Sequence, residues 1–175
     1  MRPYIISKRI STQHRVRLYK TYIEPVLLYN SETWSLTSKQ EESLDSFHRR
    51  LLRIVLNIRY PKIISNQKLY DITKKKPLST KIKKRRLALF GHILRLDPDT
   101  PAQKALQYYM TPHKRPAGRP PLTWIAVITK DITKTLTHHN IKKPLTKKSL
   151  EKLSVIAKDS SLWRREIVRN MEDAL

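Results

Sequence analysis

The chain has no cysteine and only two glycines among its 175 residues. The lack of cysteine excludes disulfides, thiol chemistry and any zinc site with cysteine ligands. With Gly91 and Gly118 as the only glycines, no glycine-rich phosphate-binding loop can be built. No apolar run is long enough to cross a membrane, and residues 1–9 lack the apolar segment of a secretory signal. We therefore expect an intracellular protein of the nucleus or of a cytoplasmic ribonucleoprotein, with no membrane partner.

Acidic residues are also scarce, and their arrangement does not fit metal-dependent catalysis. Polymerases and many nucleases cluster carboxylates around two metal ions. The chain has no Asp-Asp pair, as a polymerase palm would carry, and no acid-x-Lys triplet, as a restriction-like nuclease would need. Its six histidines show no pairing at ligand spacing on one helix face. We expect no catalytic residue, no metal, no cofactor and no small-molecule substrate.

Positive charge is what the chain has in excess. It contains 37 Lys and Arg against 14 Asp and Glu, for a formal net charge of +23. Self-repulsion of this size opposes a compact state unless a polyanion neutralises it. Concentrated positive charge is also the electrostatic footprint of nucleic-acid binding. We expect RNA, DNA or an RNA–DNA hybrid as the partner, and the alternatives are a charge that serves solubility alone and a basic organelle protein.

The spacing of apolar residues is helical throughout. Pro25 should end or kink the first helix, and the residue before it, Glu24, should be extended. The clearest helix runs from about 38 to 58 and begins with a capping box of Ser38 and Glu41. Its packing stripe is predicted to consist of six apolar residues, which fall within about 100° of helix circumference. These residues are Leu44, Phe47, Leu51, Ile54, Val55 and Ile58.

A second long helix is predicted from Ser79, as its cap, to about Leu96. Its apolar face should hold Ile82, Leu89, Ile93 and Leu96, and the opposite face Lys84, Gly91 and Arg95. A glycine inside a helix costs about 1 kcal/mol relative to alanine. We therefore expect another helix or backbone segment to approach Gly91 closely. Trp34, Trp124 and Trp163 are expected to anchor the core.

Residues 111–121 interrupt this helical pattern with four prolines and one glycine. Such a segment cannot form regular structure, so we interpret it as a linker or arm. The sequence thus predicts an all-α fold, an irregular helical bundle in two parts joined by a Pro-rich basic arm. The predicted ranges are 1–110, 111–121 and 122–175.

Basic segments in and around these helices are the candidate phosphate contacts. Basic side chains on one helix face can follow phosphates and release counterions, and Arg can also stack on bases. The alternatives are a solvated helix face or, for residues 83–86, a nuclear-import signal. Tyr108 and Tyr109 could stack on bases, although we expect at least one in the core. The candidate nucleic-acid-binding residues are Arg49, Arg50, Arg53, Lys74, Lys75, Lys76, Lys83, Lys84, Arg85, Arg86, Arg95, Lys114, Arg115 and Arg119.

A set of short motifs, in this order, resembles the C-terminal part of non-LTR (LINE-type) retrotransposon reverse transcriptases. The similarity spans nearly the whole chain, and the specificity lies in the order of motifs that are individually weak. One departure is Asn30, where the family usually has Gly; Asn tolerates the left-handed backbone that such a turn needs. The motifs are residues 18–23, 25–29, Ser31-Glu32-Thr33-Trp34, 47–50, 52–54, 85–87, 90–95, 118–121, 123–124, 157–159 and 163–165.

The resemblance implies that the first part, 1–110, is a thumb-like helical region that grips a template–primer duplex. It implies a C-terminal helical extension after the arm, and a polymerase palm elsewhere in the parent protein as a further partner. The chain itself would then be a non-catalytic fragment of an RNA-directed DNA polymerase. The alternatives are a free-standing, co-opted nucleic-acid-binding protein and a helical protein-interaction module.

Overall fold

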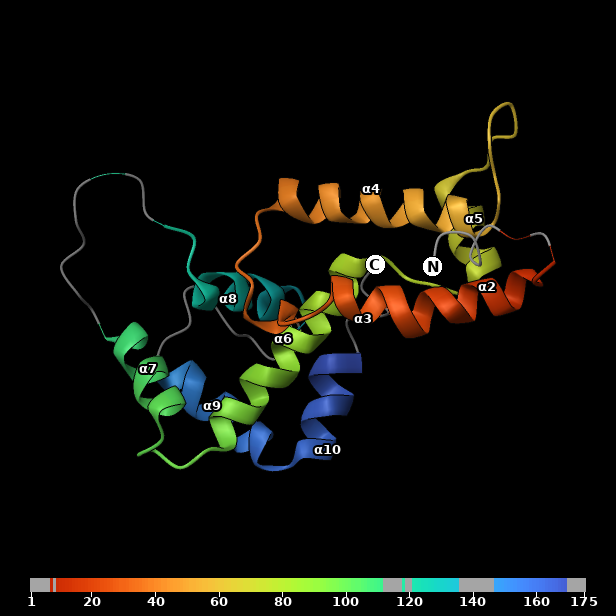
Figure 1. The fold of residues 1–175 in the computed structure, drawn as a ribbon. Helices are drawn as coiled ribbons and strands as arrows, with labels where there is room; N and C mark the ends of the chain where they lie inside the picture. Colours follow the sequence, from red (N-terminus) through yellow and green to blue (C-terminus); the bar gives the residue numbers. More distant parts are fainter. Residues whose placement is uncertain (1–6, 8, 112–117, 119–120, 136–146, 170–175) are drawn as a thin grey trace. The chain divides into compact units, whose positions relative to one another are not determined.

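The computed structural model describes residues 7, 9–111, 118, 121–135 and 147–169, and these residues form an all-α fold, as predicted (Figure 1). The chain divides into two compact units. The first unit comprises residues 1–30 and 37–81, and the second comprises 31–36 and 82–175. These bounds differ from the predicted ranges 1–110, 111–121 and 122–175. Most of the predicted arm lies outside the described residues, so its role as a linker stays a prediction.

The first unit begins with a helical rod built from three segments, α2 (Thr12–Leu18), η1 (Tyr19–Ile23) and α3 (Glu24–Leu27). Glu24 is helical, with φ −59° and ψ −41°, so the predicted extended geometry is wrong. The reason is the π-helical segment η1, in which the Glu24 amide donates to the Tyr19 carbonyl five residues earlier. Pro25 follows in the first turn of α3, where its missing N–H does no harm.

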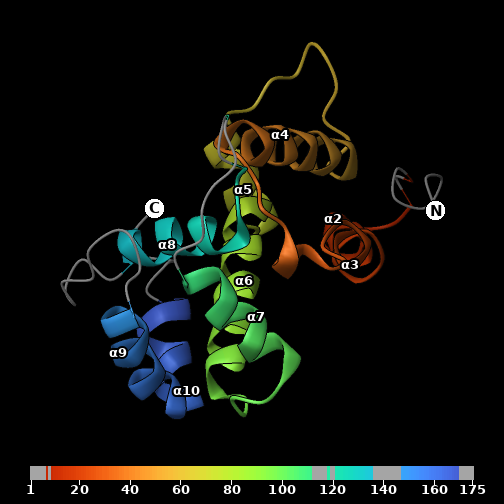
Figure 2. The same cartoon turned by 90° about the vertical axis from the view of Figure 1, so that its left-hand side faces the viewer.

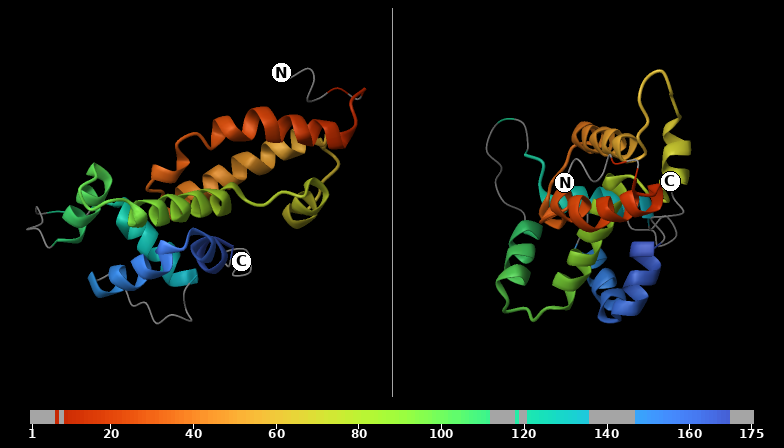
Figure 3. Two further views of the ribbon diagram at one scale, coloured as in Figure 1. Left: turned by 90° about the horizontal axis from the view of Figure 1, so that it is seen from below. Right: turned by 45° about the vertical axis from the view of Figure 1, so that its right-hand side comes forward.

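Helix α4 (Ser38–Val55) runs beside this rod (Figure 3). It begins at Ser38 as predicted, but the predicted capping box of Ser38 and Glu41 is wrong, because Thr37 is the N-cap and forms the capping box with Gln40. Its buried face consists of Asp45, His48, Leu52 and Val55. The predicted stripe is therefore wrong in part: Val55 is buried, but Phe47 and Ile54 are exposed.

Asp45 and His48 lie on the buried face of α4 because each has a hydrogen-bond partner inside the first unit. Asp45 accepts hydrogen bonds from the Ser79 amide at 2.9 Å and the Ser79 hydroxyl at 2.6 Å. This carboxylate, rather than Ser79 itself, satisfies the start of helix α6 (Leu78–Arg95). The apolar cluster of the unit is small, since its buried members are Tyr19, Leu52, Val55 and Leu69. Leu69 comes from the short helix α5 (Asn66–Thr73), whose N-cap is Ser65.

His48 gives the first unit a pH dependence. Its side chain is fully buried, its Nδ1 lies 2.6 Å from the Tyr19 hydroxyl, and burial followed by the nearby Lys81 charge lowers its pKa to about 4. Since the pKa in the unfolded chain is about 6.5, the unfolded state binds the proton more tightly. Stability from this group is therefore complete above pH 6.5 and is lost as pH falls toward 4, by on the order of 3 kcal/mol.

Urea unfolding followed by near-ultraviolet circular dichroism of tyrosine will measure this loss between pH 7 and 4. We expect His48→Leu to flatten the dependence between pH 6.5 and 4, while His92→Asn, at an exposed site in α6, leaves it unchanged. A folded-state NMR titration of His48 with a midpoint above 6 would contradict the prediction.

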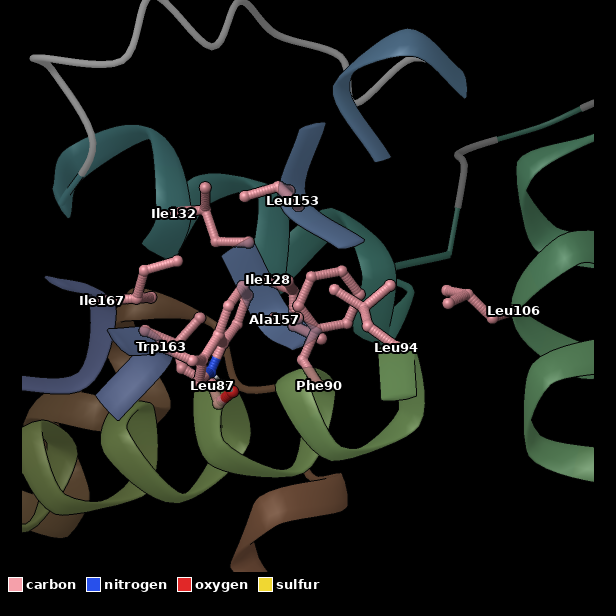
Figure 4. Packing of buried hydrophobic residues seen from close by; sticks show 10 residues of the cluster. All are labelled: Leu87, Phe90, Leu94, Leu106, Ile128, Ile132, Leu153, Ala157, Trp163 and Ile167. Carbon is pink, nitrogen blue, oxygen red and sulfur yellow. Dashed lines mark hydrogen bonds between the residues drawn. The ribbon is translucent and has the colours of Figure 1, made fainter. Parts of the chain in front are cut away.

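The second unit is built around α6, whose turns from Ile82 onward belong to it. Helices α8 (Trp124–Thr135), α9 (Lys147–Lys158) and α10 (Ser160–Trp163) gather beside α6, and the π-helical segment η4 (Arg164–Arg169) follows α10 (Figure 2). Helix α7 (Pro101–Met110) is joined to α6 by the Gln103 amide, which donates to the Ile93 carbonyl at 2.7 Å. The core, shown in Figure 4, contains Leu87, Phe90, Leu94, Leu106, Ile128, Ile132, Leu153, Ala157, Trp163 and Ile167.

Gly91 faces this core, so the predicted polar face of α6 that included it is wrong. The predicted close approach is confirmed, and the approaching group is the indole of Trp163. A Cβ at position 91 would overlap the indole nitrogen and its neighbouring ring carbons. The same nitrogen donates to the Leu87 carbonyl at 3.0 Å (Figure 4). Trp163 is an anchor of the core, as predicted, and Trp124 is half-buried against it.

The Ser31–Leu36 segment belongs to the second unit although the first unit surrounds it in sequence. Its 3-10 turn η2 (Ser31–Thr33) follows Asn30, whose φ of 52° confirms the predicted left-handed turn. The Trp124 indole donates to the Glu32 carbonyl at 2.8 Å. The Arg86 guanidinium donates to the Trp34 carbonyl at 3.3 Å, and Trp34 itself is half-buried. Two carbonyls thus attach this segment to α6 and α8.

Candidate nucleic-acid interface

Several of the predicted phosphate contacts have partners within the protein. Arg49 forms an ion pair with Glu42 at 2.6 Å, and Arg53 donates to the Asn66 side chain at 2.7 Å. Lys75 lies 2.9 Å from the Glu24 carboxylate and is largely buried, with Lys81 on the other oxygen of the same carboxylate. Burial lowers the pKa of Lys75. For Glu24, burial favours a higher pKa, but the hydrogen bonds from Lys81 and Lys75 outweigh it and lower the pKa.

Arg86 is fully buried, unlike the other predicted contacts that the structure describes. Its side chain is 0% exposed, and its Nε lies 3.2 Å from the carboxylate of Asp131, which is also buried. Sequence reasoning placed Arg86 with its neighbours in one basic run, but a helix turns each successive residue by about 100°. Arg86 therefore points toward α8, and its guanidinium is not accessible for the predicted phosphate contact. Arg95 is exposed and donates to the Ala157 carbonyl at 3.0 Å.

The Lys74-Lys75-Lys76 run places its outer members at the surface. Lys74 ends α5 in a left-handed conformation, with φ 50° and ψ 41°. The residues after it, 75–77, have no regular secondary structure. Lys74 and Lys76 are exposed, while Lys75 turns inward to Glu24. Lys75 thus forms an ion pair inside the protein, whereas Lys74 and Lys76 form a basic turn at the surface.

The remaining predicted residues are divided among α4, α6 and the arm. Arg50 is exposed on α4, and Lys83 and Lys84 are half-buried on α6. Arg85 is exposed, with its guanidinium 3.9 Å from Glu32. Lys114, Arg115 and Arg119 lie outside the described residues, and their contribution stays a prediction.

The charge exposed on the first unit is mainly positive. Among its described residues, Glu42 and Asp71 are the exposed acids, whereas Arg50, Lys74, Lys76 and several other Lys and Arg residues are exposed. Glu24 and Asp45 are buried, where Glu24 is paired with two lysines and Asp45 accepts from Ser79. The exposed part of the unit can therefore attract a polyanion.

Sequence reasoning missed a further basic segment, the loop between α4 and α5. Arg59 and Lys62 are exposed there on either side of Tyr60-Pro61, whose peptide bond is cis. The signal available in the sequence was a proline and an aromatic residue between two basic residues. Tyr108 and Tyr109 are also both exposed, so the expectation that one lies in the core is wrong. Their rings are 6.0 Å apart, edge to face, on α7.

Two further properties of the described residues bear on the class of protein. Among them, no three histidine, aspartate or glutamate side chains are grouped so that they could hold a metal ion. A search of the same residues finds no helix with the length and apolar character that a membrane span requires. These residues define an all-α protein with strongly basic surface segments.

The chain resembles a protein derived from a transposon. It is 26% identical over 160 residues to the uncharacterized transposon-derived protein F52C9.6 of Caenorhabditis elegans. The match covers 89% of this chain and 54% of that protein, so the chain spans about half the length of this curated relative. No family model and no solved structure matches the chain. The similarity supports a transposon-related origin.

Proposed function

We propose that the chain is a non-catalytic C-terminal region of a transposon-encoded RNA-directed DNA polymerase, and that it binds nucleic acid through phosphates. The observation that carries the binding part is the exposure of Arg50, Lys74 and Lys76 in a unit whose Glu24 and Asp45 are buried. The polymerase context rests on the ordered motifs, among them Ser31–Trp34, and agrees with the similarity to a transposon-derived protein. The proposed partner is RNA, DNA or their hybrid, inside the cell.

Phosphate binding of this kind has a definite salt signature. Each phosphate neutralised releases counterions, so the logarithm of the binding constant falls linearly with the logarithm of the salt concentration. If about six phosphates are contacted, affinity should fall on the order of 10³-fold between 50 and 200 mM salt. Sequence preference should be weak, because phosphates carry no base identity.

Neutralising the exposed cations tests the proposal. We expect the triple variant Arg50→Gln, Lys74→Gln and Lys76→Gln to weaken binding at least about tenfold and to reduce the salt slope by about one for each lost contact. Fluorescence anisotropy with labelled duplex, hybrid and single-stranded probes, across a salt series, gives both values. Arg86 is left intact, since its neutralisation would disturb the core rather than the surface.

A matched variant removes the same charge elsewhere. Lys39→Gln, Lys104→Gln and Lys152→Gln change three exposed helical lysines that are not among the candidate contacts. Equal losses in both triple variants would show that only net charge matters. No binding at low salt by the folded wild-type chain would contradict the proposal.

Exposed apolar side chains favour a second candidate function, a helical protein-interaction module. Tyr22, Val26 and Tyr29 on the α2–α3 rod and the turn after it are exposed, as are Phe47 and Ile54 on α4. If the chain binds a protein partner with an affinity that does not change with salt concentration, and has no affinity for nucleic acid, this candidate is favoured over the first.

A further inference from the structure

The loop from Asn57 to Ile64 projects beyond both α4 and α5 (Figures 1 and 2). Its start is fixed by the end of α4. Asn57 is left-handed, with φ 58°, and its amide donates to the Ile54 carbonyl at 3.0 Å. The next amide, of Ile58, donates to the Arg53 carbonyl at 2.9 Å, which completes a Schellman motif. The loop therefore leaves the helix in one defined direction.

The return of the loop is also fixed. Ile64 is half-buried and packs against the apolar cluster of the first unit, and Ser65 then caps α5. The Arg53 side chain, which donates to Asn66 at 2.7 Å, joins the end of α4 to the start of α5. Both ends of the loop are thus held, and only its tip is in solvent.

The tip is a tight turn with an aromatic ring between two cations. The Lys62 amide donates to the Arg59 carbonyl at 2.9 Å, which brings Arg59 and Lys62 within about 7 Å of each other at their Cα atoms. Tyr60 lies between them and is 90% exposed, and Ile63 beside them is 83% exposed. The ring of Tyr60 is therefore presented to solvent on a projecting, anchored turn, with a cation on each side of it in the sequence.

We infer that this turn binds an unpaired segment of nucleic acid, with Tyr60 stacked on a base and Arg59 and Lys62 on the flanking phosphates. Every base has an aromatic face, so such stacking tolerates any sequence. A base inside a continuous duplex offers no free face, and this turn should therefore discriminate unpaired strands and overhangs from blunt duplex. The inference rests on the proposed function and adds the class of nucleic acid that the protein distinguishes.

Replacing Tyr60 separates stacking from charge. We expect Tyr60→Ala in the full chain to weaken binding of a single-stranded oligonucleotide about tenfold, within the roughly 5- to 150-fold range that base stacking allows. The salt slope should not change, because no charge is removed. Binding of a blunt duplex of equal length should also stay unchanged, and Tyr60→Phe should keep wild-type affinity.

Two controls complete the design. Tyr29→Ala changes another tyrosine of the first unit that is 80% exposed, and it should leave binding unchanged. A single-stranded probe that contains 2-aminopurine should lose fluorescence on binding to the wild-type chain and to Tyr60→Phe, but not to Tyr60→Ala. This quenching reports ring-to-base contact directly.

The outcomes distinguish this inference from the proposed function. If the wild-type chain binds with a steep salt slope and Tyr60→Ala binds every probe equally well, the inference is wrong and the proposed function stands. If the wild-type chain binds no probe, both are wrong. If Tyr60→Ala affects only flotation with anionic phosphatidylserine vesicles, the turn contacts a lipid surface and the inference is overturned.

Discussion

Arg86→Met is expected to destabilise the second unit by about 3–5 kcal/mol, which is a large fraction of the stability of a typical domain. The change leaves the Asp131 carboxylate buried without the guanidinium that lies 3.2 Å from it. It also removes the donor to the Trp34 carbonyl. Urea unfolding followed by tryptophan emission will measure the loss, because Trp34, Trp124 and Trp163 all belong to the second unit.

A double variant tests whether the buried charge is the cause. Replacing an ion pair by apolar residues of similar volume is often neutral or stabilising, so Arg86→Met with Asp131→Leu should recover most of the loss. Arg85→Gln, at the exposed neighbouring position, should change stability by less than about 0.5 kcal/mol. A wild-type unfolding midpoint for Arg86→Met would contradict this account of the ion pair.

Trp163→Ala is the second change with a large expected effect, a loss of about 3–5 kcal/mol. It removes the largest aromatic ring of the core and the donor to the Leu87 carbonyl. Gly91, the other residue of this contact, should respond to substitution differently from most glycines inside helices. Gly91→Ala should destabilise by about 1–3 kcal/mol through overpacking, although the same change ordinarily stabilises a helix.

The two changes should not be additive. Once Trp163 is alanine, a methyl group at position 91 has no ring to overlap, and its helix propensity should make Gly91→Ala neutral or stabilising. Chemical unfolding of the two single variants and the double variant, followed by the emission of Trp34 and Trp124, gives this coupling. Additive losses would show that the close approach of ring and glycine has no energetic consequence.

The all-α class could be predicted from apolar spacing, but the buried faces could not. On α4, the packing face contains Asp45 and His48, which no apolar pattern marks as buried. Their burial depends on Ser79 and Tyr19, residues that are distant in sequence. The same limit applies to the basic residues, since the exposed cation Arg85 and the buried one Arg86 are neighbours in one run. Charge leads to an expectation about the class of partner, which stays a prediction, whereas the accessibility of each cation depends on tertiary contacts.

The continuation of the helical rod through Pro25 could not be predicted from a local rule either. Proline ends a helix in an otherwise regular ladder, but the π-helical segment Tyr19–Ile23 shifts the hydrogen-bonding register before the proline arrives. By contrast, the left-handed Asn30 and the close approach at Gly91 were predicted correctly. Both depend on the conformational and steric properties of one residue type, which the sequence states directly.

The membership of Ser31–Leu36 in the second unit limits how this chain can be divided or recombined. A break anywhere between residues 37 and 81 would separate this segment from Arg86 and Trp124, whose donors its carbonyls accept. A contiguous piece that starts at Ile82 would therefore lack two acceptors of its own core. Each unit is assembled from two separate stretches of sequence, so any contiguous piece that contains the whole of one unit also carries part of the other.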